Sequence, residues 1–518
     1  MRMFSLLNAA LYSGRNRFPT GVPVGCPSSP AIHSTTVAAG WNRGWVWVAV
    51  AVLALTGCQP TTSRPRDKGG ATASDSAAGG TENVQRPAVP LRVWCVADQS
   101  ASDRLQRQWQ ASSDRTLELR WFTPAQLLQS QSCDCDVVIY PAQLLGELVD
   151  RDWLAELPSS GKAAPALGMS SSSSSAAVDP TSDAFDATAG SSESIAGVEQ
   201  SRYGKRSWAM SLGVTTPVLL SNFALPASFS EEGGLTADAV AYWSAVEAAL
   251  RDKVGDRPAA GLASDQIDAT ALCDRFLLVA MSLAERESRF GVTLDPESLK
   301  SRLTSEAALQ AAEIIWRLTQ LNPQPLSVAG SHEAAWLALQ QDQPGVTIGL
   351  PPSPTPEVDA VTKISAYAPP EAFFVGRAKR TQGWNSGHGL IVSIAKECRQ
   401  TAQSTGFVRW LTTDATRTVL ARRWDGVAAD STYPPGSSAW QTQRIGRRLV
   451  QQPHLPLEPR WMRAWECRQI LGEALASMVR GQATPSEALK GAAAAWDRLN
   501  SDKERTRFQV SVEQSLGL

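Results

Sequence analysis

The 518-residue sequence predicts an α/β protein built around a parallel sheet with helices on both faces. From Leu91 onward, short apolar segments rich in valine and isoleucine alternate with longer stretches whose apolar residues recur at helical spacing. Strands separated by helices in this way favour parallel pairing. Hydrophobic residues make up 43% of the chain and charged residues 19%, which is sufficient for a large core and for more than one domain.

The first regular region predicts three strands, each followed by a helix. The expected strands are Leu91–Val96, Leu117–Trp121 and Cys135–Tyr140, the expected helices are Ser102–Gln110, Pro124–Leu128 and Leu144–Val149, and Trp153–Leu157 completes the unit. Residues 159–204, which include six consecutive serines, interrupt this pattern. Because low-complexity segments lack the apolar residues that a core needs, we expect 159–204 to be a surface insertion.

The second half predicts one strand and a larger share of helix. The apolar run Val214–Leu220 is the expected strand. A helix over 237–254 would place Val240, Trp243, Val246 and Leu250 on one face and end at Gly255; Thr304 or Ser305 would cap a helix over 306–321; and Thr484-Pro485-Ser486-Glu487 begins another helix. Trp243, Trp316, Trp410 and Trp496 fall on apolar helix faces and are expected in the core.

The N-terminus carries the pattern of an export signal. An uncharged apolar run, residues 44–57, directly follows Arg43 and ends in Leu55-Thr56-Gly57-Cys58. This ending resembles the lipobox of bacterial lipoproteins, in which the cysteine is lipidated and everything before it is removed. We therefore expect 1–57 to be a signal peptide and 58–88, rich in Pro, Gly, Ser and Thr, to be a flexible tether. The alternative is an ordinary secretory signal in which Cys58 has no role.

Charge and motifs exclude several classes of function. Lys and Arg number 49 and Asp and Glu 50, so there is no basic excess for nucleic acid. The sequence has no Cys-x-x-Cys pair, no Gly-x-Ser-x-Gly turn and no P-loop. His332-Glu333 begins like a zinc-protease helix, but Trp336 stands where the second histidine ligand is needed. We therefore expect no catalytic residue, no metal and no cofactor.

Six cysteines follow Cys58: Cys95, Cys133, Cys135, Cys273, Cys398 and Cys467. Cys133 and Cys135 would share one face of an extended segment, as a plain apolar pair, a structural disulfide or a redox pair. Cys95 ends its strand whereas the other two begin theirs, so we expect them at opposite edges of a parallel sheet and not bonded. Sequence alone does not pair the cysteines further.

Several stretches resemble, in order, segments of one protein family. They are LRVWCVADQ at 91–99, CDVVIYPAQLLGELVDRDWLAEL at 135–157, KRSWAMSLGVTTPVLLSNFAL at 205–225, SHEAAWLALQQDQPGVTIGLPPS at 331–353, the Gly-rich return and helices at 383–421, and GQATPSEALKGAAAAWDRL at 481–499. Together they resemble the extracellular solute-binding proteins of ABC importers, particularly the maltose-binding-like sugar group. The chain departs from that family in its serine insert, in the loss of an aromatic residue around Pro351-Pro352, and in the proline-rich stretch 351–370.

The resemblance implies a two-lobed, type II periplasmic-binding-protein fold whose lobes are joined by crossing strands. Lobe one would comprise 88–213 and 384–430, and lobe two 214–383 and 431–518. The implied function is capture of a small polar solute, a sugar by preference, for an ABC permease, with attachment to the membrane through a lipid on the periplasmic or cell-surface side. A non-sugar ligand is one alternative. A surface-anchored sensory or structural lipoprotein that keeps the fold is another.

Open α/β sheets bind ligands beyond the carboxyl ends of their strands. That rule selects Asp98 and Gln99 after the first strand, and Tyr140 and Gln143 after the third. Asp98 would accept hydrogen bonds from hydroxyls, unless it is only a helix N-cap. The two glutamines would donate and accept.

Two further segments would contribute to the same site. Tyr140 or Trp384 would stack on a sugar ring, because an aromatic face suits its apolar C–H edges. The resemblance adds Thr215 and Asn385 at matching positions in the crossing segments.

Overall fold

The computed structural model describes residues 89–96, 99–158, 195–226, 229, 238–255, 266–284, 293–341, 343–350, 364–370, 389–421, 433–450, 459–499 and 504–517. The predicted signal peptide 1–57 and the whole predicted tether 58–88, with Cys58, lie outside these residues. Within them, no helix is long and apolar enough to cross a membrane.

A five-stranded sheet forms the first region. Its strand order is β2 (Leu117–Phe122), β1 (Leu91–Val96), β3 (Val137–Pro141), β10 (Leu390–Ile394) and β6 (Met210–Ser211). β1 pairs in parallel with β2 and β3, as predicted, but β10 is antiparallel to both β3 and β6. The sheet is therefore mixed. The expectation of a purely parallel sheet is wrong for the strands that enter from later in the chain.

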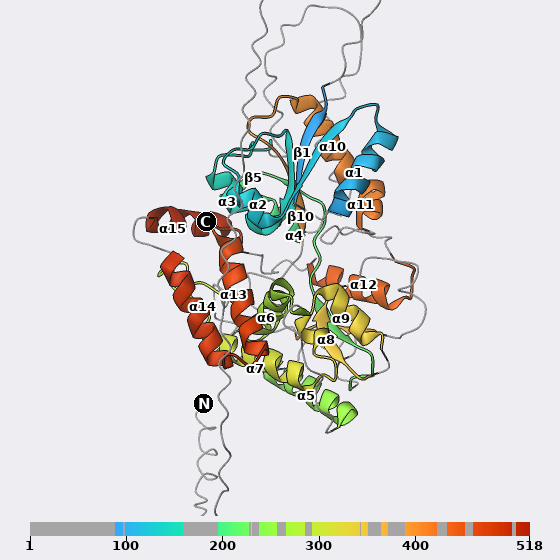
Figure 1. Ribbon diagram of the computed structural model, residues 1–518, viewed down its shortest axis with the longest axis vertical. Helices are drawn as coiled ribbons and strands as arrows, with labels where there is room; N and C mark the ends of the chain where they lie inside the picture. The colour runs from blue at the N-terminus through green and yellow to red at the C-terminus, as the bar shows by residue number, and fades with distance from the viewer. Residues whose placement is uncertain are drawn as a thin grey trace, which may run out of the picture. The chain divides into compact units, whose positions relative to one another are not determined.

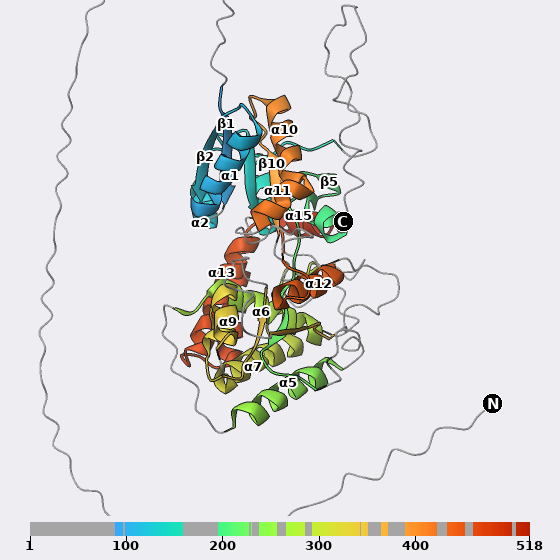
Figure 2. The ribbon, with the colours of Figure 1, turned by 90° about the vertical axis from the view of Figure 1, so that its right-hand side faces the viewer.

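Both faces of this sheet are buried because its strands present apolar residues alternately to each side. Val93 and Cys95 of β1 pack in one cluster, with α1 (Gln99–Ser112), α10 (Thr401–Thr412) and α11 (Asp414–Ala421). Trp94 and Val96 pack in the other, with α2 (Pro124–Gln129), the 3-10 helix η1 (Ala142–Leu144) and α3 (Leu145–Asp150). Figures 1 and 2 show α1, α10 and α11 beside β1 and β10. Such two-sided cover explains the near-continuous apolar strands.

The insertion is shorter than predicted. Residues 195–204 belong to the packed body: they form α4 (Ile195–Gln200) and β4 (Arg202–Tyr203), which pairs with β5 (Arg206–Ser207). Tyr203 is buried, and its hydroxyl lies 2.5 Å from Ser511 Oγ. The prediction of a surface insertion is therefore wrong for 195–204. Residues 159–194 lie outside the described residues.

The second region contains a smaller sheet with order β8 (Val346–Gly349), β7 (Val218–Ser221) and β9 (Ser365–Tyr367). Both pairings are antiparallel. Leu219 and Ile348 face a large helical cluster, whereas Val218 and Leu220 face α9 (His332–Leu339) and α12 (Ser438–Val450). Both faces of this sheet are thus covered as well.

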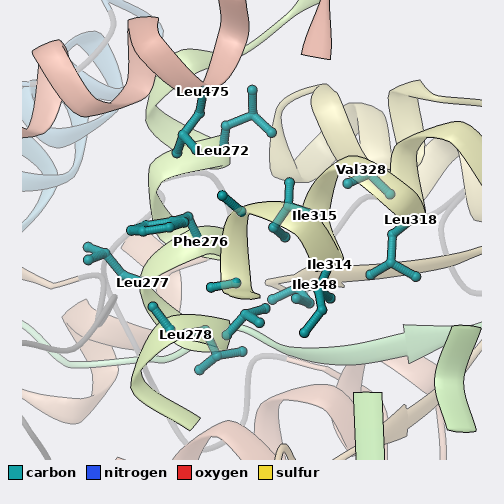
Figure 3. Packing of buried hydrophobic residues seen from close by; sticks show 14 of the residues in the cluster. Leu272, Phe276, Leu277, Leu278, Ile314, Ile315, Leu318, Val328, Ile348 and Leu475 are labelled. Atoms are coloured by element: carbon teal, nitrogen blue, oxygen red, sulfur yellow. The ribbon is translucent and has the colours of Figure 1, made fainter. Parts of the chain in front are cut away.

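The large cluster is built mainly from helices: α5 (Ala239–Val254), α6 (Ala269–Leu283), α7 (Glu306–Leu321), α8 (Leu326–Ala329), α13 (Ala464–Val479) and α14 (Pro485–Leu499). Figure 3 shows Phe276 and Leu272 of α6 packing beside Ile315 of α7 and Leu475 of α13. A close crossing of α6 and α13 depends on Gly472, because a Cβ there would lie only 2.3 Å from the carbonyl oxygen of Ala269.

The helix boundaries in this region follow the predicted signals. Ser305 caps α7 through a bond from Ala308 N, and Gly255 ends α5 with a positive φ of 65°. Thr484 and Glu487 form the reciprocal cap before α14. Two burial predictions are wrong: the side chain of Val240, in the first turn of α5, is 50% exposed, and Trp316 is 39% exposed.

The last helix, α15 (Arg505–Ser515), contacts α3 and β4, which belong to the first region. Arg460 reinforces this contact by donating to the carbonyl oxygens of Arg202 and Ser515, at 2.6 and 2.9 Å. Part of the range predicted for lobe two, 431–518, therefore packs on elements predicted for lobe one. The predicted lobe boundaries stay a prediction.

Candidate functional site

Seven contact residues are predicted from the sequence, and the structure describes the side chains of three of them, Tyr140, Gln143 and Thr215. Gln99 is the first residue of α1, at the carboxyl end of β1, but its side chain is not described. Asp98, Trp384 and Asn385 lie outside the described residues. The site is therefore built here from the third strand and the segments beside it.

Tyr140 is a core residue. Its side chain is fully buried near the end of β3, and its hydroxyl lies 2.6 Å from Ser393 Oγ on β10. Burial raises the pKa of this phenol well above its usual range, while the hydrogen bond with Ser393 lowers it in part. Since the ring exposes no face, its contacts fit packing and do not fit the predicted stacking on a sugar.

Gln143 lies in η1, immediately beyond the carboxyl end of β3, as the strand-end rule predicts. Its side chain is only 5% exposed, and Oε1 has no hydrogen-bond partner. The neighbouring Ala142 N donates to Gly389 O at 3.2 Å, so η1 is held against the start of β10. An unpartnered buried amide oxygen costs roughly 1–3 kcal/mol. Gln143 Oε1 can therefore accept a hydrogen bond without giving up another one.

A second buried amide lies in the same neighbourhood. Gln200, the last residue of α4, is 2% exposed, and its Oε1 is also unpartnered. It approaches Gly389 so closely that a Cβ on that glycine would fall 2.5 Å from Gln200 Oε1 and 2.8 Å from Gly213 O. We call Gln143, Gln200, Gly213 and Gly389 the polar corner.

The polar corner gathers segments that are far apart in the chain. It joins the carboxyl end of β3, the end of α4, the residues after β6 and the start of β10. Glycine at 389 is required because any side chain would displace the amide of Gln200 or the backbone at Gly213. The corner thus holds two buried amide oxygens, and such oxygens can accept hydrogen bonds from hydroxyl groups.

Thr215 lies two residues beyond Gly213, on the segment that leads from the first sheet to β7. Its side chain is half-buried, and its Oγ1 lies 3.5 Å from where a Cβ on Gly446 of α12 would be. Thr215 is therefore close in sequence to the polar corner and close in space to α12. Its predicted contact with a solute stays a prediction.

An aromatic residue that the sequence analysis missed lies close to η1. Trp465, in the first turn of α13, is half-buried against the cluster that contains Tyr140 and Ala142, and its indole Nε1 has no hydrogen-bond partner. The helix α13 contacts η1. Trp465 therefore offers a half-buried aromatic ring and an unpartnered N–H donor in the cluster that contains Ala142.

The segment before Trp465 is fixed by two contacts with α3. Arg463 N donates to Glu147 Oε2 at 3.1 Å. Gly146 allows the backbone of Arg460 to approach, since a Cβ at 146 would fall 1.9 Å from Arg460 O. The one local feature that marks Trp465 is its position in the first turn of the long helix α13. Nothing local, however, connects it to the third strand.

The His332-Glu333 pair lies on α9, in the second region. His332 is bound to Asp274 through Nε2 and Oδ2, at 3.2 Å, and Trp336 is buried in the core. Within the described residues, no group of three or more His, Cys, Asp or Glu side chains is placed to hold a metal ion. What the described groups offer is hydrogen bonding and an aromatic surface.

Comparison with known proteins identifies the fold. No protein-family model matches the chain, and no curated protein matches it in sequence. Among solved structures, the sugar-binding protein MalE from the phytopathogen Xanthomonas citri is similar, with a TM-score of 0.54 at 14% identity, covering 81% of this chain and 99% of that one. The chain has the fold of the maltose-binding proteins.

Two other structures support this assignment. T. maritima MalE3 with bound maltose gives a TM-score of 0.51 at 14% identity, over 80% of this chain and 100% of that one. The Thermus thermophilus maltotriose-binding protein, bound with maltotriose, gives 0.50 at 13% identity, over 79% and 100%. The predicted two-lobed solute-binding fold is therefore confirmed. At this level of identity the similarity establishes the fold alone.

Proposed function

We propose that this protein is an extracytoplasmic solute-binding protein that captures a small polar solute, a sugar by preference, and delivers it to an ABC permease. The observation that carries the proposal is the pair of buried, unpartnered amide oxygens at the carboxyl end of the first sheet, in a chain with the maltose-binding fold. The protein would bind its solute by hydrogen bonds and stacking, without covalent chemistry.

The proposed contacts suit a polyol. Gln143 and Gln200 would accept hydrogen bonds from hydroxyl groups, which would offset the cost of burying their oxygens. Trp465 would offer an aromatic face and an N–H donor. Asp98, Gln99, Trp384 and Asn385 complete the set as sequence predictions, with Thr215 from the crossing segment. Tyr140 is left out because its ring is buried.

A ligand screen tests solute binding directly. Maltose, maltotriose and other neutral sugars would be compared with amino acids and inorganic phosphate in thermal melting of the full chain. A ligand present at ~100 times its Kd stabilises the folded state by about 2.7 kcal/mol, so a binding sugar should raise the melting temperature measurably. A shift with amino acids or phosphate alone would overturn the sugar assignment. No shift with any compound would count against solute binding.

Trp384 provides a second test at a position predicted from sequence alone. Trp384→Ala should weaken binding of the best sugar by roughly 1–3 kcal/mol, as truncated aromatic anchors usually do. Its melting temperature without sugar should stay close to that of the wild type. A variant that binds normally but melts much lower would make Trp384 a core residue.

The proposed anchor rests on the sequence around Cys58. Lipidation there would hold the body at a membrane through the tether 58–88, close to a permease. Cys58→Ser should move the protein from the membrane fraction to the soluble fraction of fractionated cells. Unchanged membrane association would rule out the lipid at Cys58 without affecting the proposal for the polar corner.

A further inference from the structure

A pair of cysteines lies outside the candidate site, in the loop between α2 and β3. Cys133 and Cys135 are both buried, whereas the side chain of Asp134 between them is 64% exposed. The two sulfur atoms are 3.3 Å apart. This separation places them within hydrogen-bond contact of each other.

The loop that carries these cysteines is fixed at two places. The Asp136 carboxylate accepts hydrogen bonds from Arg92 N at 3.0 Å, from Arg92 Nε at 3.3 Å and from Arg399 N at 2.9 Å. The Arg92 guanidinium also pairs with Asp134. Because β1 and the segment after β10 both hold the loop, the two sulfurs stay together as part of the fold.

The two thiols differ in chemical character. Cys133 is 8% exposed, and a hydrogen bond with Cys135, assisted by the charge of Arg92, lowers its pKa despite its burial. Cys135 is fully buried, and burial raises its pKa. In thiol–disulfide exchange the thiolate is the nucleophile. Cys133 is therefore suited to attack first and Cys135 to resolve.

We propose that Cys133 and Cys135 form a reversible dithiol–disulfide pair that exchanges with external disulfides. The Cys133 thiolate attacks one sulfur of a disulfide RSSR, forming a mixed disulfide and releasing one RSH after protonation. Cys135 then loses its proton and attacks the Cys133 sulfur, which expels the second RSH. The protein loses two electrons and two protons, and RSSR gains them.

The exchange is confined to this pair. Cys95 packs in the cluster on the opposite face of the sheet from Cys133 and Cys135. No disulfide joins Cys133 to Cys135 in this structure, so the pair is in its reduced form. Cys95 pairs in register with Ile139, four residues beyond Cys135. These cysteines therefore lie toward opposite ends of their strands, as the sequence predicts, and also on opposite faces of the sheet.

Peptide mapping of the full chain tests the proposal. The protein would be incubated with glutathione disulfide, alkylated while unfolded, and digested with trypsin, which releases residues 121–151 with Cys133 and Cys135 as the peptide's two cysteines. The expected result is loss of both alkylation sites, restored by dithiothreitol before alkylation. Two alkylated thiols at every ratio of oxidised to reduced glutathione would overturn the proposal.

Two matched variants test the assigned order of attack. Cys135→Ser should trap glutathione on Cys133, because the resolving thiol is gone. Cys133→Ser should leave Cys135 largely unmodified, because that thiol is buried and protonated. Equal modification of both variants, with melting curves like that of the wild type, would contradict the assigned roles. If either variant fails to fold, the peptide map of the wild-type protein still shows whether Cys133 and Cys135 form a disulfide.

Discussion

Arg275 on α6 and Gln143 in η1 are both buried polar side chains, but only Arg275 has its polar atoms satisfied within the protein. The Arg275 guanidinium donates to the carbonyl oxygens of Ile348, Val328 and Gly330 at 2.8, 2.7 and 2.6 Å. Gln143 Oε1, like Gln200 Oε1, has no partner.

We propose that this difference separates polar side chains that stabilise the fold from polar side chains that bind a solute. The carbonyls that Arg275 reaches lie in β8 and at the end of α8, where helix carbonyls lack intrahelical partners. Arg275 therefore joins two elements of the core. The amide oxygens of the polar corner join no other described element. A residue of the first kind should matter for stability, and one of the second kind for binding.

The largest expected effect is at Arg275. Arg275→Met should lower the free energy of unfolding by about 3 kcal/mol or more, because it leaves buried carbonyl groups without donors. Arg251→Met, at an exposed arginine on α5, is the matched control and should change stability little. Denaturant unfolding measures both. If both variants lower the free energy of unfolding by the same small amount, Arg275 does not stabilise the fold in the way proposed.

Close packing in the helical cluster gives the next effect. Gly472→Ala should destabilise the protein by about 1–3 kcal/mol, because its Cβ would overlap the Ala269 carbonyl and separate α13 from α6. Gly491→Ala, on the exposed face of α14 with no atom within 4 Å of the new Cβ, should instead stabilise by about 0.5–1 kcal/mol. Thermal melting distinguishes these opposite signs. A stabilised Gly472→Ala would show that the two helices do not cross so closely.

Trp465 tests whether the region beside η1 contributes to binding. Trp465→Phe keeps an aromatic ring but removes the indole donor, so binding of the best sugar should weaken by about 1 kcal/mol if Nε1 donates to it. The melting temperature without sugar should change little, since this N–H has no partner in the protein. Calorimetric titration measures the loss. If the affinity for the sugar is unchanged, the indole N–H of Trp465 does not bind the sugar and the residue serves only in packing.

The smallest effect concerns pH. Burial raises the pKa of the Asp150 carboxyl, with partial relief from Ser511 and Arg507. A raised carboxyl pKa favours folding at pH values below the unfolded pKa, and this contribution is lost as the pH rises through the folded pKa. Asp150→Asn should therefore melt higher than wild type near pH 7, and the gain should shrink towards about pH 4. If the gain in melting temperature instead grew as the pH fell, the pKa of Asp150 would be lowered in the folded protein and not raised.

Local sequence predicted elements well where burial is uniform. β1 has the predicted bounds Leu91–Val96 because a central strand covered on both faces reads as one apolar run. Ser305, Gly255 and Thr484 act within one turn of their helices, so their caps could also be predicted. The antiparallel direction of β10 could not, because it depends on where the chain returns to the sheet.

The candidate site could likewise be predicted from the sequence only where a residue's position depends on its own strand. The strand-end rule found Gln143, but Gln200 and Gly389 reach its neighbourhood only through tertiary packing. Tyr140 obeys the same rule and is nevertheless core, since its register with β10 places it opposite Ile391 and beside Ser393. The approach of Trp465 to η1 depends on the contacts of Arg460 and Arg463 with α3, which no local pattern encodes.

Calorimetric titration of amide variants tests the central claim most directly. Gln143→Met and Gln200→Met keep the side-chain size and remove the unpartnered oxygen, and Gln110→Met, at an exposed amide near the end of α1, is the control. With the sugar that raises the melting temperature most, we expect each corner variant to bind about tenfold or more weakly, which corresponds to about 1.4 kcal/mol. Both should melt at or above the wild-type temperature without sugar, and Gln110→Met should bind normally. Wild-type affinity in both corner variants would contradict the account, because the two buried amides would then not contact the solute.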